Sequence, residues 1–202
     1  MSGRKPARRP RRTTVAAPTR GALRIVAGRA GGRRIDVPAG DGTRPTSDRV
    51  REAVFNALES LDAIDGARVV DPFAGSGALG IEALSRGAVH ATFADADPHA
   101  IEVVRRNLDA LGLSADATVV PGSAERAVAT AATIDLALLD PPYAYDGWDA
   151  LLDALVPRLS PDGVVVIESD REVPLPAGLV GIRSKTYGGT VVQFAAAAGA
   201  PT

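Results

Sequence analysis

Residues 71–80 read DPFAGSGALG, and this stretch decides the fold that the sequence predicts. The apolar run at 67–73 indicates a buried strand, and the apolar spacing at 78–87 indicates a helix. Between the two, Gly75, Gly77 and Gly80 form the pattern G-x-G-x-x-G. Glycines let a ligand approach the backbone closely, and the N-terminus of a helix offers unpaired N–H groups. We therefore expect a ligand-binding loop at the end of the first strand of an α/β sheet.

The same rhythm of strand, turn and helix continues after this loop. We expect a terminal hairpin at 183–194 that turns at Gly188 and Gly189. Alternating strands and helices with apolar strands are typical of a parallel sheet that is covered on both faces. The predicted fold class is therefore α/β: a Rossmann-like, doubly wound, mostly parallel sheet with a C-terminal antiparallel hairpin. The other predicted strands are 90–95, 117–122, 134–140 and 163–169, and the helices between them are 98–112, 123–132 and 147–159.

The chain that precedes the sheet predicts a separate hairpin and a helix. Two short strands flank a turn at 30–32, and the apolar spacing at 49–61 indicates a helix that Ser47 or Asp48 would cap. Residues 1–21 are rich in Pro, Arg and Gly and have few apolar side chains, so we expect them to be disordered. The expected organisation is a basic tail at 1–21, an extension at 22–64 and a core at 65–202.

Charge is distributed unevenly along a chain whose formal net charge is −1. Residues 1–34 hold eleven of the 23 lysines and arginines and no acidic residue, so all 24 acidic residues lie in the rest of the chain. A basic arm on an acidic body is typical of a protein that binds a polyanion, most often a nucleic acid. The alternative is a basic tail that only adds solubility or that reflects the choice of start site. The predicted hairpin would carry Arg24, Arg29, Arg33 and Arg34 on or beside its strands.

The composition excludes several classes of function. The sequence has no cysteine and only two histidines, so we expect no disulfide framework, no cysteine nucleophile and no metal site. No apolar run reaches the roughly 18 residues that a membrane span needs. No apolar segment of a secretion signal follows the basic start. We therefore expect neither a membrane-embedded segment nor a cleaved leader.

Two carboxylates stand beside the predicted ligand loop. The glycine pattern fits NAD(P) as well as S-adenosylmethionine, but Asp71 would repel a pyrophosphate and would suit a ligand with a cationic amino-acid end. Asp95 follows the strand at 90–95 and could accept hydrogen bonds from ribose hydroxyls, which both ligands have. Asp97 could instead cap the helix that begins at Pro98. Asp71 therefore favours S-adenosylmethionine, and Asp95 does not discriminate.

The tetrapeptide Asp140-Pro141-Pro142-Tyr143 follows the apolar strand at 134–140. Two prolines fix a rigid turn at the carboxyl end of the sheet, where ligands bind in open α/β folds. Asp140 and the Pro141 carbonyl could accept the N–H groups of an exocyclic amine, and Tyr143 could stack on the base that carries it. These groups suit methyl transfer to a nucleobase nitrogen. The alternative is a Pro-Pro turn with a purely structural role.

Together, DPFAGSGALG and DPPY resemble the class I S-adenosylmethionine-dependent methyltransferases that act on amino groups of nucleobases. Within that class, RIVAGRAGGRRIDVP, TRPTSDRVREAVFNAL, GALGIEALSRGA and KTYGGT resemble the 16S rRNA guanine-N2 methyltransferase family of the RsmD type. The resemblance covers about residues 23–195. It implies transfer of a methyl group from S-adenosylmethionine to N2 of one guanine in 16S rRNA, free or in an assembling small subunit. It also implies a cytoplasmic protein, which we expect to be a monomer.

The resemblance also assigns roles to residues. Where the family often has an aspartate after its third strand, this sequence reads Gly-Ser-Ala at 122–124, and Ser123 could equally cap a helix. Arg51 could hold RNA or the active-site loop, or could lie on a solvated helix face. The implied cofactor site comprises Asp71, Pro72, Phe73, Ala74, Gly75, Ser76, Gly77, Asp95, Ala96, Ser123 and Ala124, and the implied catalytic site comprises Asp140, Pro141, Pro142 and Tyr143. The candidates for RNA binding are Arg24, Arg29, Arg33, Arg34, Arg44, Thr46 and Arg51.

Three other functions are compatible with these motifs. DPPY also occurs in adenine-N6 methyltransferases, so the tetrapeptide fixes the chemistry and not the base. The glycine pattern alone would also fit an NAD(P)-dependent oxidoreductase. A non-catalytic RNA-binding assembly factor could use the same scaffold. The stretch TRPTSDRVREAVFN at 43–56 is the specific part of the resemblance and favours the guanine-N2 enzyme.

Overall fold

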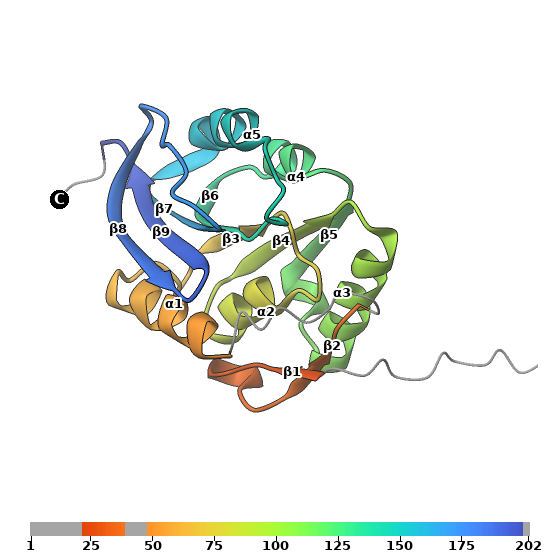
Figure 1. The fold of residues 1–202 in the computed structure, drawn as a ribbon. Helices are drawn as coiled ribbons and strands as arrows, with labels where there is room; N and C mark the ends of the chain where they lie inside the picture. The colour runs from red at the N-terminus through yellow and green to blue at the C-terminus, as the bar shows by residue number, and fades with distance from the viewer. Residues whose placement is uncertain (1–21, 39–47, 200–202) are drawn as a thin grey trace, which may run out of the picture.

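A computed structural model describes residues 22–38 and 48–199 of the chain (Figure 1). The predictions made for residues 1–21 and for Arg44, Thr46 and Ser47 lie outside the described residues. No helix within the described ranges is both long and apolar enough to cross a membrane. The same residues contain no group of three or more His, Cys, Asp or Glu side chains that could hold a metal ion.

The centre of the molecule is a seven-stranded sheet with the strand order β5-β4-β3-β6-β7-β9-β8. Its first five strands are parallel, and β9 runs antiparallel to both β7 and β8. The predicted fold class is therefore confirmed. The order of the strands reverses between β3 and β6, and ligands bind at such a switch point in open α/β sheets. The strands are β3 (Arg68–Asp71), β4 (His90–Asp95), β5 (Ala117–Pro121), β6 (Ile134–Leu139), β7 (Leu159–Ser169), β8 (Leu179–Tyr187) and β9 (Thr190–Ala197).

Helices cover both faces of this sheet, with α4 and α5 on one face and α1, α2 and α3 on the other (Figure 1). Successive strand residues point to opposite faces, so Leu138 packs in the cluster under α1 to α3 and Leu139 packs under α4 and α5. This two-sided burial explains why the strands read as continuous apolar runs. The helices are α1 (Asp48–Ser60), α2 (Ala78–Ser85), α3 (Pro98–Leu111), α4 (Ala124–Thr130) and α5 (Trp148–Leu155).

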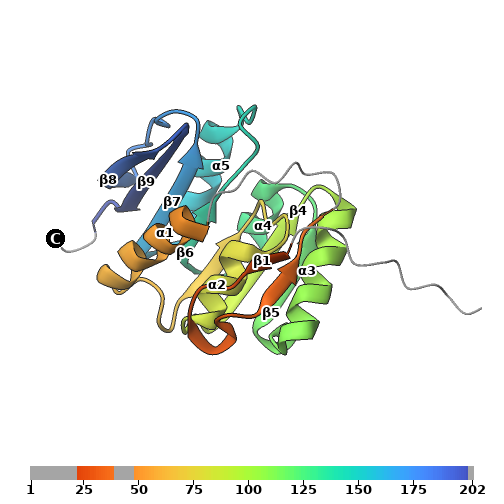
Figure 2. The ribbon, with the colours of Figure 1, turned by 60° about the horizontal axis from the view of Figure 1, so that its bottom comes forward.

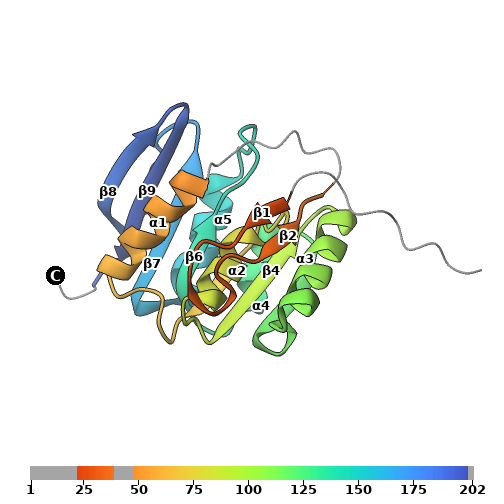
Figure 3. The ribbon, with the colours of Figure 1, turned by 90° about the horizontal axis from the view of Figure 1, so that it is seen from below.

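Residues 22–38 form the predicted hairpin, which we call the N-terminal ribbon. Its strands β1 (Ala22–Arg24) and β2 (Arg34–Asp36) pair antiparallel in a separate two-stranded sheet. The ribbon lies across α2 and α3 on the outside of the molecule (Figures 2 and 3). Leu23 and Ile35 face each other across the ribbon and pack into the same apolar cluster as α1, α2 and the sheet. The ribbon is therefore part of the packing on this face of the sheet.

The predicted helix at 147–159 is shorter than the apolar spacing indicates. α5 ends at Leu155, and a 3-10 turn (Val156–Arg158) follows it. The reason is Pro157, which has no N–H group with which to continue the helix. The chain then enters β7 directly, four residues before the strand that the sequence predicts.

Candidate active site

Two loops that follow neighbouring strands meet at the switch point of the sheet. β3 leads into the glycine loop (residues 72–77) and β6 leads into the Asp-Pro-Pro-Tyr loop (residues 140–147). The Phe73 ring of the first loop packs edge-on against the Tyr145 ring of the second, with 5.1 Å between the ring centroids. Tyr145 packs in the same way on Trp148, at 5.3 Å. Aromatic contact therefore holds the two loops side by side, and the buried Trp148 anchors them to α5.

The glycines of the loop have two different tasks. Gly77 adopts a left-handed conformation (φ 81°) that begins α2, and Gly75 also has a positive φ of 53°. A Cβ at Gly80 would lie 2.3 Å from the Phe93 ring of β4, so this glycine allows α2 to pack closely on the sheet. A Cβ at Gly75 would meet no atom within 4 Å. Space for a ligand is thus left beside the backbone at Gly75.

Asp71 lies at the end of β3 beneath the glycine loop and is 1% exposed. Its Oδ2 atom accepts a hydrogen bond from the Gly80 N–H at 3.0 Å. Its Oδ1 atom is buried and has no partner among the described residues. The pKa of Asp71 is raised to about 7: burial is the largest cause, the hydrogen bond from the Gly80 N–H opposes it, and the charge of the neighbouring Asp95 adds to it. A half-satisfied buried carboxyl with this pKa is suited to a cationic ligand group.

Asp95 at the end of β4 contacts the glycine loop directly. Its Oδ2 atom accepts a hydrogen bond from the Gly75 N–H at 2.8 Å, and its Oδ1 atom accepts one from the Asp97 N–H at 2.9 Å. The Asp97 carboxylate accepts a hydrogen bond from the His99 N–H at 2.8 Å and so caps α3, as the alternative assignment had it. Asp95 is thus the carboxylate that lies beside the loop, and Asp97 holds the helix.

The loop after β5 reaches the same edge of the sheet. The Gly122 N–H donates to the Asp95 backbone carbonyl at 3.0 Å. Ser123 is exposed and caps α4, because its hydroxyl accepts from the Arg126 N–H at 3.4 Å. A hydrogen bond with the Ser123 side chain lowers the pKa of Glu125. Ser123 therefore caps α4, which is one of the two roles that the sequence analysis left open for it.

The Asp-Pro-Pro-Tyr residues form the turn that leaves β6. The Pro142 carbonyl accepts a hydrogen bond from the Tyr145 N–H at 2.8 Å, which closes the turn. Asp140 and Tyr143 are partly exposed, whereas Pro141 is buried. The Tyr143 hydroxyl is 2.8 Å from the Thr190 Oγ1 atom at the start of β9. This hydrogen bond fixes the Tyr143 ring against the terminal hairpin.

Thr190 is a site residue that the sequence analysis did not single out. It is 9% exposed and directly follows the Gly188-Gly189 turn of the hairpin. The signal for it was present, since Thr190 ends the KTYGGT stretch that carries part of the resemblance. The terminal hairpin therefore supports the Asp-Pro-Pro-Tyr loop as well as closing the sheet.

Tyr145 is held in place by polar contacts as well as by its two ring neighbours. Its single hydroxyl proton is shared between a Glu125 carboxylate oxygen and the Gly147 carbonyl oxygen, each 3.1 Å from the hydroxyl oxygen. Burial raises the pKa of Tyr145 far above its usual value, with Glu125 and Asp146 adding to the shift. Tyr145 therefore stays protonated at neutral pH and positions the loop.

The structure corrects the assignment of Arg51 to an RNA-binding surface. Arg51 is 2% exposed, so neither that surface nor a solvated helix face describes it. Its Nη2 atom donates to the Arg24 carbonyl of the ribbon, and its Nε atom is 3.9 Å from the Glu82 carboxylate. Arg51 therefore ties α1 to the ribbon and to α2, and we do not propose it as an RNA contact.

Two of the four arginines of the ribbon bind other groups of the protein, and the other two are exposed. Arg29 forms an ion pair with Asp116, and Arg33 donates to the Ala110 and Leu111 carbonyls at the C-terminus of α3. Arg24 and Arg34 are exposed and lie directly opposite each other across β1 and β2. Like charges in directly opposed positions repel, so this pair favours an anion between or above the two side chains.

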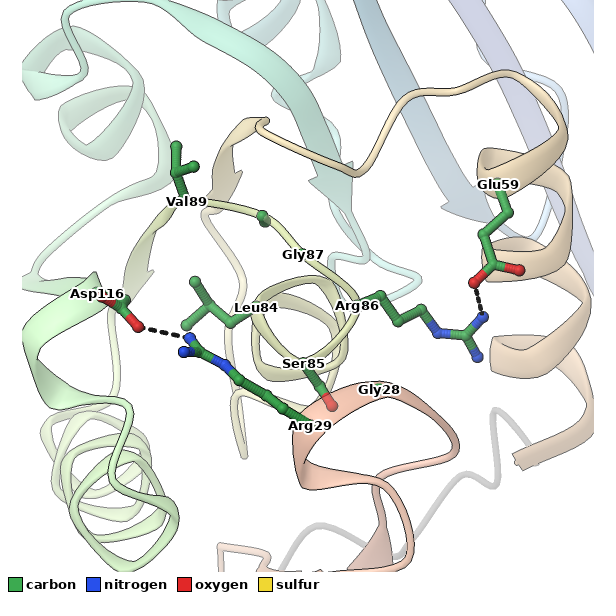
Figure 4. Close-up of a pocket in the computed structure, with 10 residues that line it drawn as sticks. Gly28, Arg29, Glu59, Leu84, Ser85, Arg86, Gly87, Val89 and Asp116 are labelled. Carbon is green, nitrogen blue, oxygen red and sulfur yellow. Dashed lines mark hydrogen bonds and ion pairs between the residues drawn. The ribbon is translucent and has the colours of Figure 1, made fainter.

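A pocket of about 640 Å³ lies away from these loops (Figure 4). It is lined by the ribbon turn at Gly28 and Arg29 and by the C-terminal end of α2, including Arg86. Both arginines are paired, Arg29 with Asp116 and Arg86 with Glu59. This pocket is at the edge of the sheet where β4 begins, opposite to the edge that holds the glycine loop. It is therefore separate from the candidate site at the two loops.

Comparison with known proteins agrees with this arrangement. A family model described as Conserved hypothetical protein 95 matches residues 23–196. A Bacillus subtilis (strain 168) protein named as a candidate rRNA methyltransferase, YlbH, is 44% identical over 181 residues, which are 85% of this chain and 97% of the relative. The ribosomal RNA small subunit methyltransferase D of Haemophilus influenzae is 32% identical over 84% of this chain and 91% of the relative.

A solved structure shows the same likeness in three dimensions. It is described as a candidate methyltransferase, yhhF, from Escherichia coli, and it superimposes with a TM-score of 0.78 at 33% identity. The match covers 88% of this chain and 98% of that one. The chain therefore belongs to the Conserved hypothetical protein 95 family, and its resemblance to methyltransferases of the RsmD type is confirmed.

Proposed function

We propose that this protein transfers a methyl group from S-adenosylmethionine to the exocyclic N2 of a guanine in small-subunit rRNA. The observation that carries the proposal is the contact between the glycine loop and the Asp-Pro-Pro-Tyr loop through Phe73 and Tyr145. A methyl donor on the first loop and an amine on the second would then face each other. The names of the relatives, which include two rRNA methyltransferases, support rRNA as the substrate.

The residues on the glycine loop fit this cofactor. Asp71 Oδ1 is a buried acceptor that finds no partner within residues 22–38 and 48–199, which suits the ammonium group of the methionine part. Gly75 leaves open space where a bulkier residue would place a side chain. The Asp95 Oδ2 atom lies 2.8 Å from the Gly75 nitrogen, beside the glycine loop. In this position the carboxylate can also accept hydrogen bonds from ribose hydroxyls. When bound, the cofactor supplies a methyl group already activated by a sulfonium.

The Asp-Pro-Pro-Tyr loop supplies groups that fit an aromatic amine. The lone pair of such an amine is delocalised into the base, so the nitrogen is a weak nucleophile. Asp140 and the Pro141 carbonyl would each accept one N–H, which favours a pyramidal and more reactive nitrogen. Tyr143, fixed by Thr190, would stack on the base, a contact worth about 1–3 kcal/mol. Asp140 or water would take up the proton that the nitrogen gives up once it has been methylated. Alignment of the reacting atoms supplies most of the catalysis.

The ribbon supplies the most accessible contacts for an RNA backbone. Arg24 and Arg34 are exposed and directly opposed, whereas Arg29 and Arg33 already bind groups of the protein. We therefore assign the phosphate contacts of the ribbon to Arg24 and Arg34 first. Guanidinium groups bind phosphate in a bidentate manner, which suits this position.

The substrate and the base can be tested together in one reaction. The protein is incubated with radiolabelled S-adenosylmethionine and small-subunit rRNA, both free and in small-subunit particles, and the nucleosides are then separated. We expect the label in N2-methylguanosine. Label in N6-methyladenosine would make the protein an adenine-N6 enzyme, and no label with either substrate would favour a non-catalytic assembly factor.

The pKa of Asp71 predicts how cofactor affinity depends on pH. The free protein holds a proton on Asp71 below a pKa of about 7, and an ammonium group binds the ionised carboxylate. Below pH 7, Asp71 must therefore lose its proton before the ammonium group can bind, and the free energy of this deprotonation weakens the apparent affinity. The weakening disappears as the pH rises through 7. We expect the affinity for S-adenosylhomocysteine to rise about tenfold between pH 5.5 and pH 7, as measured by calorimetry.

The variant Asp71→Asn is the control for this pH dependence. Its amide oxygen can still accept the Gly80 N–H, but the side chain does not titrate. We expect weaker binding with little change between pH 5.5 and pH 7. The same pH slope in the variant and in the wild type would show that Asp71 does not meet the ammonium group.

A further inference from the structure

Asn107 of α3 contacts two parts of the chain with different tasks. One of its amide N–H groups donates to the Ser76 carbonyl inside the glycine loop at 2.8 Å. The same Nδ2 atom donates to the Asp36 carbonyl in β2 at 2.9 Å, and the Asn107 Oδ1 atom accepts the Asp36 N–H at 2.8 Å. A single planar amide thus holds the middle of the glycine loop and both polar backbone groups of one ribbon residue.

The surroundings of this amide make the link stiff. Asn107 is 3% exposed and lies among the buried apolar residues of α3, between Val104 and Leu108. Both of its N–H groups and its carbonyl oxygen are in use, and the hydrogen bond to the Ser76 carbonyl is buried. A change in the position of Ser76 must therefore move the amide or break a buried hydrogen bond. Movement of the amide would in turn move β2.

The polar contacts that α2 makes with the ribbon through Ser85 and Glu82 do not reach the glycine loop. The Ser85 hydroxyl of α2 accepts the Ala30 N–H at 2.9 Å and donates to the Ala27 carbonyl. The Glu82 carboxylate accepts the N–H groups of Val26 and Ala27 at 2.7 and 3.0 Å. Ser85 and Glu82 hold the turn end of the ribbon, and Asn107 holds the strand end next to the loop. Asn107 is therefore the one of these three side chains that joins the ribbon to the loop directly.

We propose that Asn107 is a positioning residue that fixes the Ser76 peptide for the cofactor and links cofactor binding to the placement of the ribbon. The inference rests on the proposed function, because it takes the glycine loop as the cofactor site. Asn107 itself need not touch the cofactor. A loop fixed in advance binds its ligand without first paying an ordering cost, so the link raises cofactor affinity. The ribbon in turn is held more firmly when the loop is occupied.

The test compares Asn107→Leu with Ser85→Ala in the full chain. Leucine has a similar shape and removes all three hydrogen bonds of Asn107, whereas Ser85→Ala loosens only the ribbon. By calorimetry, we expect S-adenosylhomocysteine affinity to fall about fivefold in Asn107→Leu, the loss that one hydrogen bond accounts for, and to change less than twofold in Ser85→Ala. In methylation assays, Asn107→Leu should raise the KM for the methyl donor and leave kcat nearly unchanged.

A second measurement uses the wild-type protein and so does not depend on the stability of a variant. S-Adenosylhomocysteine should slow amide hydrogen exchange at Asp36, whose N–H is bonded to Asn107, several-fold more than at Ala30, whose N–H is bonded to Ser85. Equal effects at the two amides, or an unchanged affinity in Asn107→Leu, would overturn the inference alone. A wild-type protein that does not bind S-adenosylhomocysteine would overturn the proposed function and the inference with it.

Discussion

Asp140→Asn should lower kcat for RNA methylation about a hundredfold or more while the protein stays folded and still binds S-adenosylhomocysteine. The variant keeps the size of the side chain, but half of its polar end becomes an N–H₂ group. The amide oxygen can still accept the N–H of the target amine, but the side chain has lost the charge that strengthens this hydrogen bond and can no longer take up the proton. A hundredfold loss corresponds to about 2.7 kcal/mol of transition-state stabilisation, which is reasonable for a charge-assisted hydrogen bond in a closed site.

The matched control is Asp146→Asn, which removes an exposed carboxylate from the same loop. Its activity should stay within twofold of the wild type, because Asp146 lies beyond the turn that Tyr145 closes. Thermal melts and calorimetry with S-adenosylhomocysteine would show that both variants fold and bind alike. A normal kcat in Asp140→Asn would remove Asp140 from the mechanism and leave the Pro-Pro turn with a structural role.

The elements around the site were predictable because their ends carry local signals. α3 begins after the Asp97 cap at Pro98 and ends before Gly112, which takes the left-handed conformation with φ 72°. β4 matches the apolar run at 90–95 in full. The sequence analysis placed both loops at the carboxyl ends of strands, and the structure adds that β3 and β6 are neighbours on either side of the switch point. Local patterns and topology rules thus suffice for this edge of the sheet.

The polar contacts that hold the ribbon were missed for a physical reason. Arg51 lies four and seven residues before Phe55 and Leu58, which is the buried side of α1, and Asn107 shares the buried side of α3 with Val104 and Leu108. Helical spacing alone is compatible with an inner face for both, although the sequence analysis took Arg51 as an RNA contact or as part of a solvated helix face and did not consider Asn107. Their partners lie far along the chain, however, and a buried polar residue is stable only with such partners. A single sequence shows the unusual position of the residue but not the group that pairs with it.

Glu82 is the polar residue on which the docking of the ribbon depends most, and its removal should have the largest effect on stability. It is fully buried and accepts the Val26 and Ala27 N–H groups, and its carboxylate lies 2.7 Å from Arg86 Nε. Arg51 approaches it from the other side at 3.9 Å. Glu82→Ala would leave two buried guanidinium groups and two backbone donors without this acceptor. We expect a loss of about 3–5 kcal/mol in the free energy of unfolding, as measured by urea denaturation.

Glu59→Gln is the control, because it removes a carboxylate that binds the same arginine from the solvent side. The Glu59 side chain is 53% exposed and its ion pair with Arg86 is 2.8 Å long, so its loss should cost less than about 1 kcal/mol. Both carboxylates bind Arg86, so the difference in the free energy of unfolding between the two variants shows how much the burial of Glu82 contributes. Glu82→Gln keeps the volume and one acceptor and should fall between them. A Glu82→Ala variant as stable as Glu59→Gln would mean that the ribbon is held without this carboxylate, by the hydrogen bonds of Ser85 and Asn107 and by apolar contacts such as those of Leu23 and Ile35.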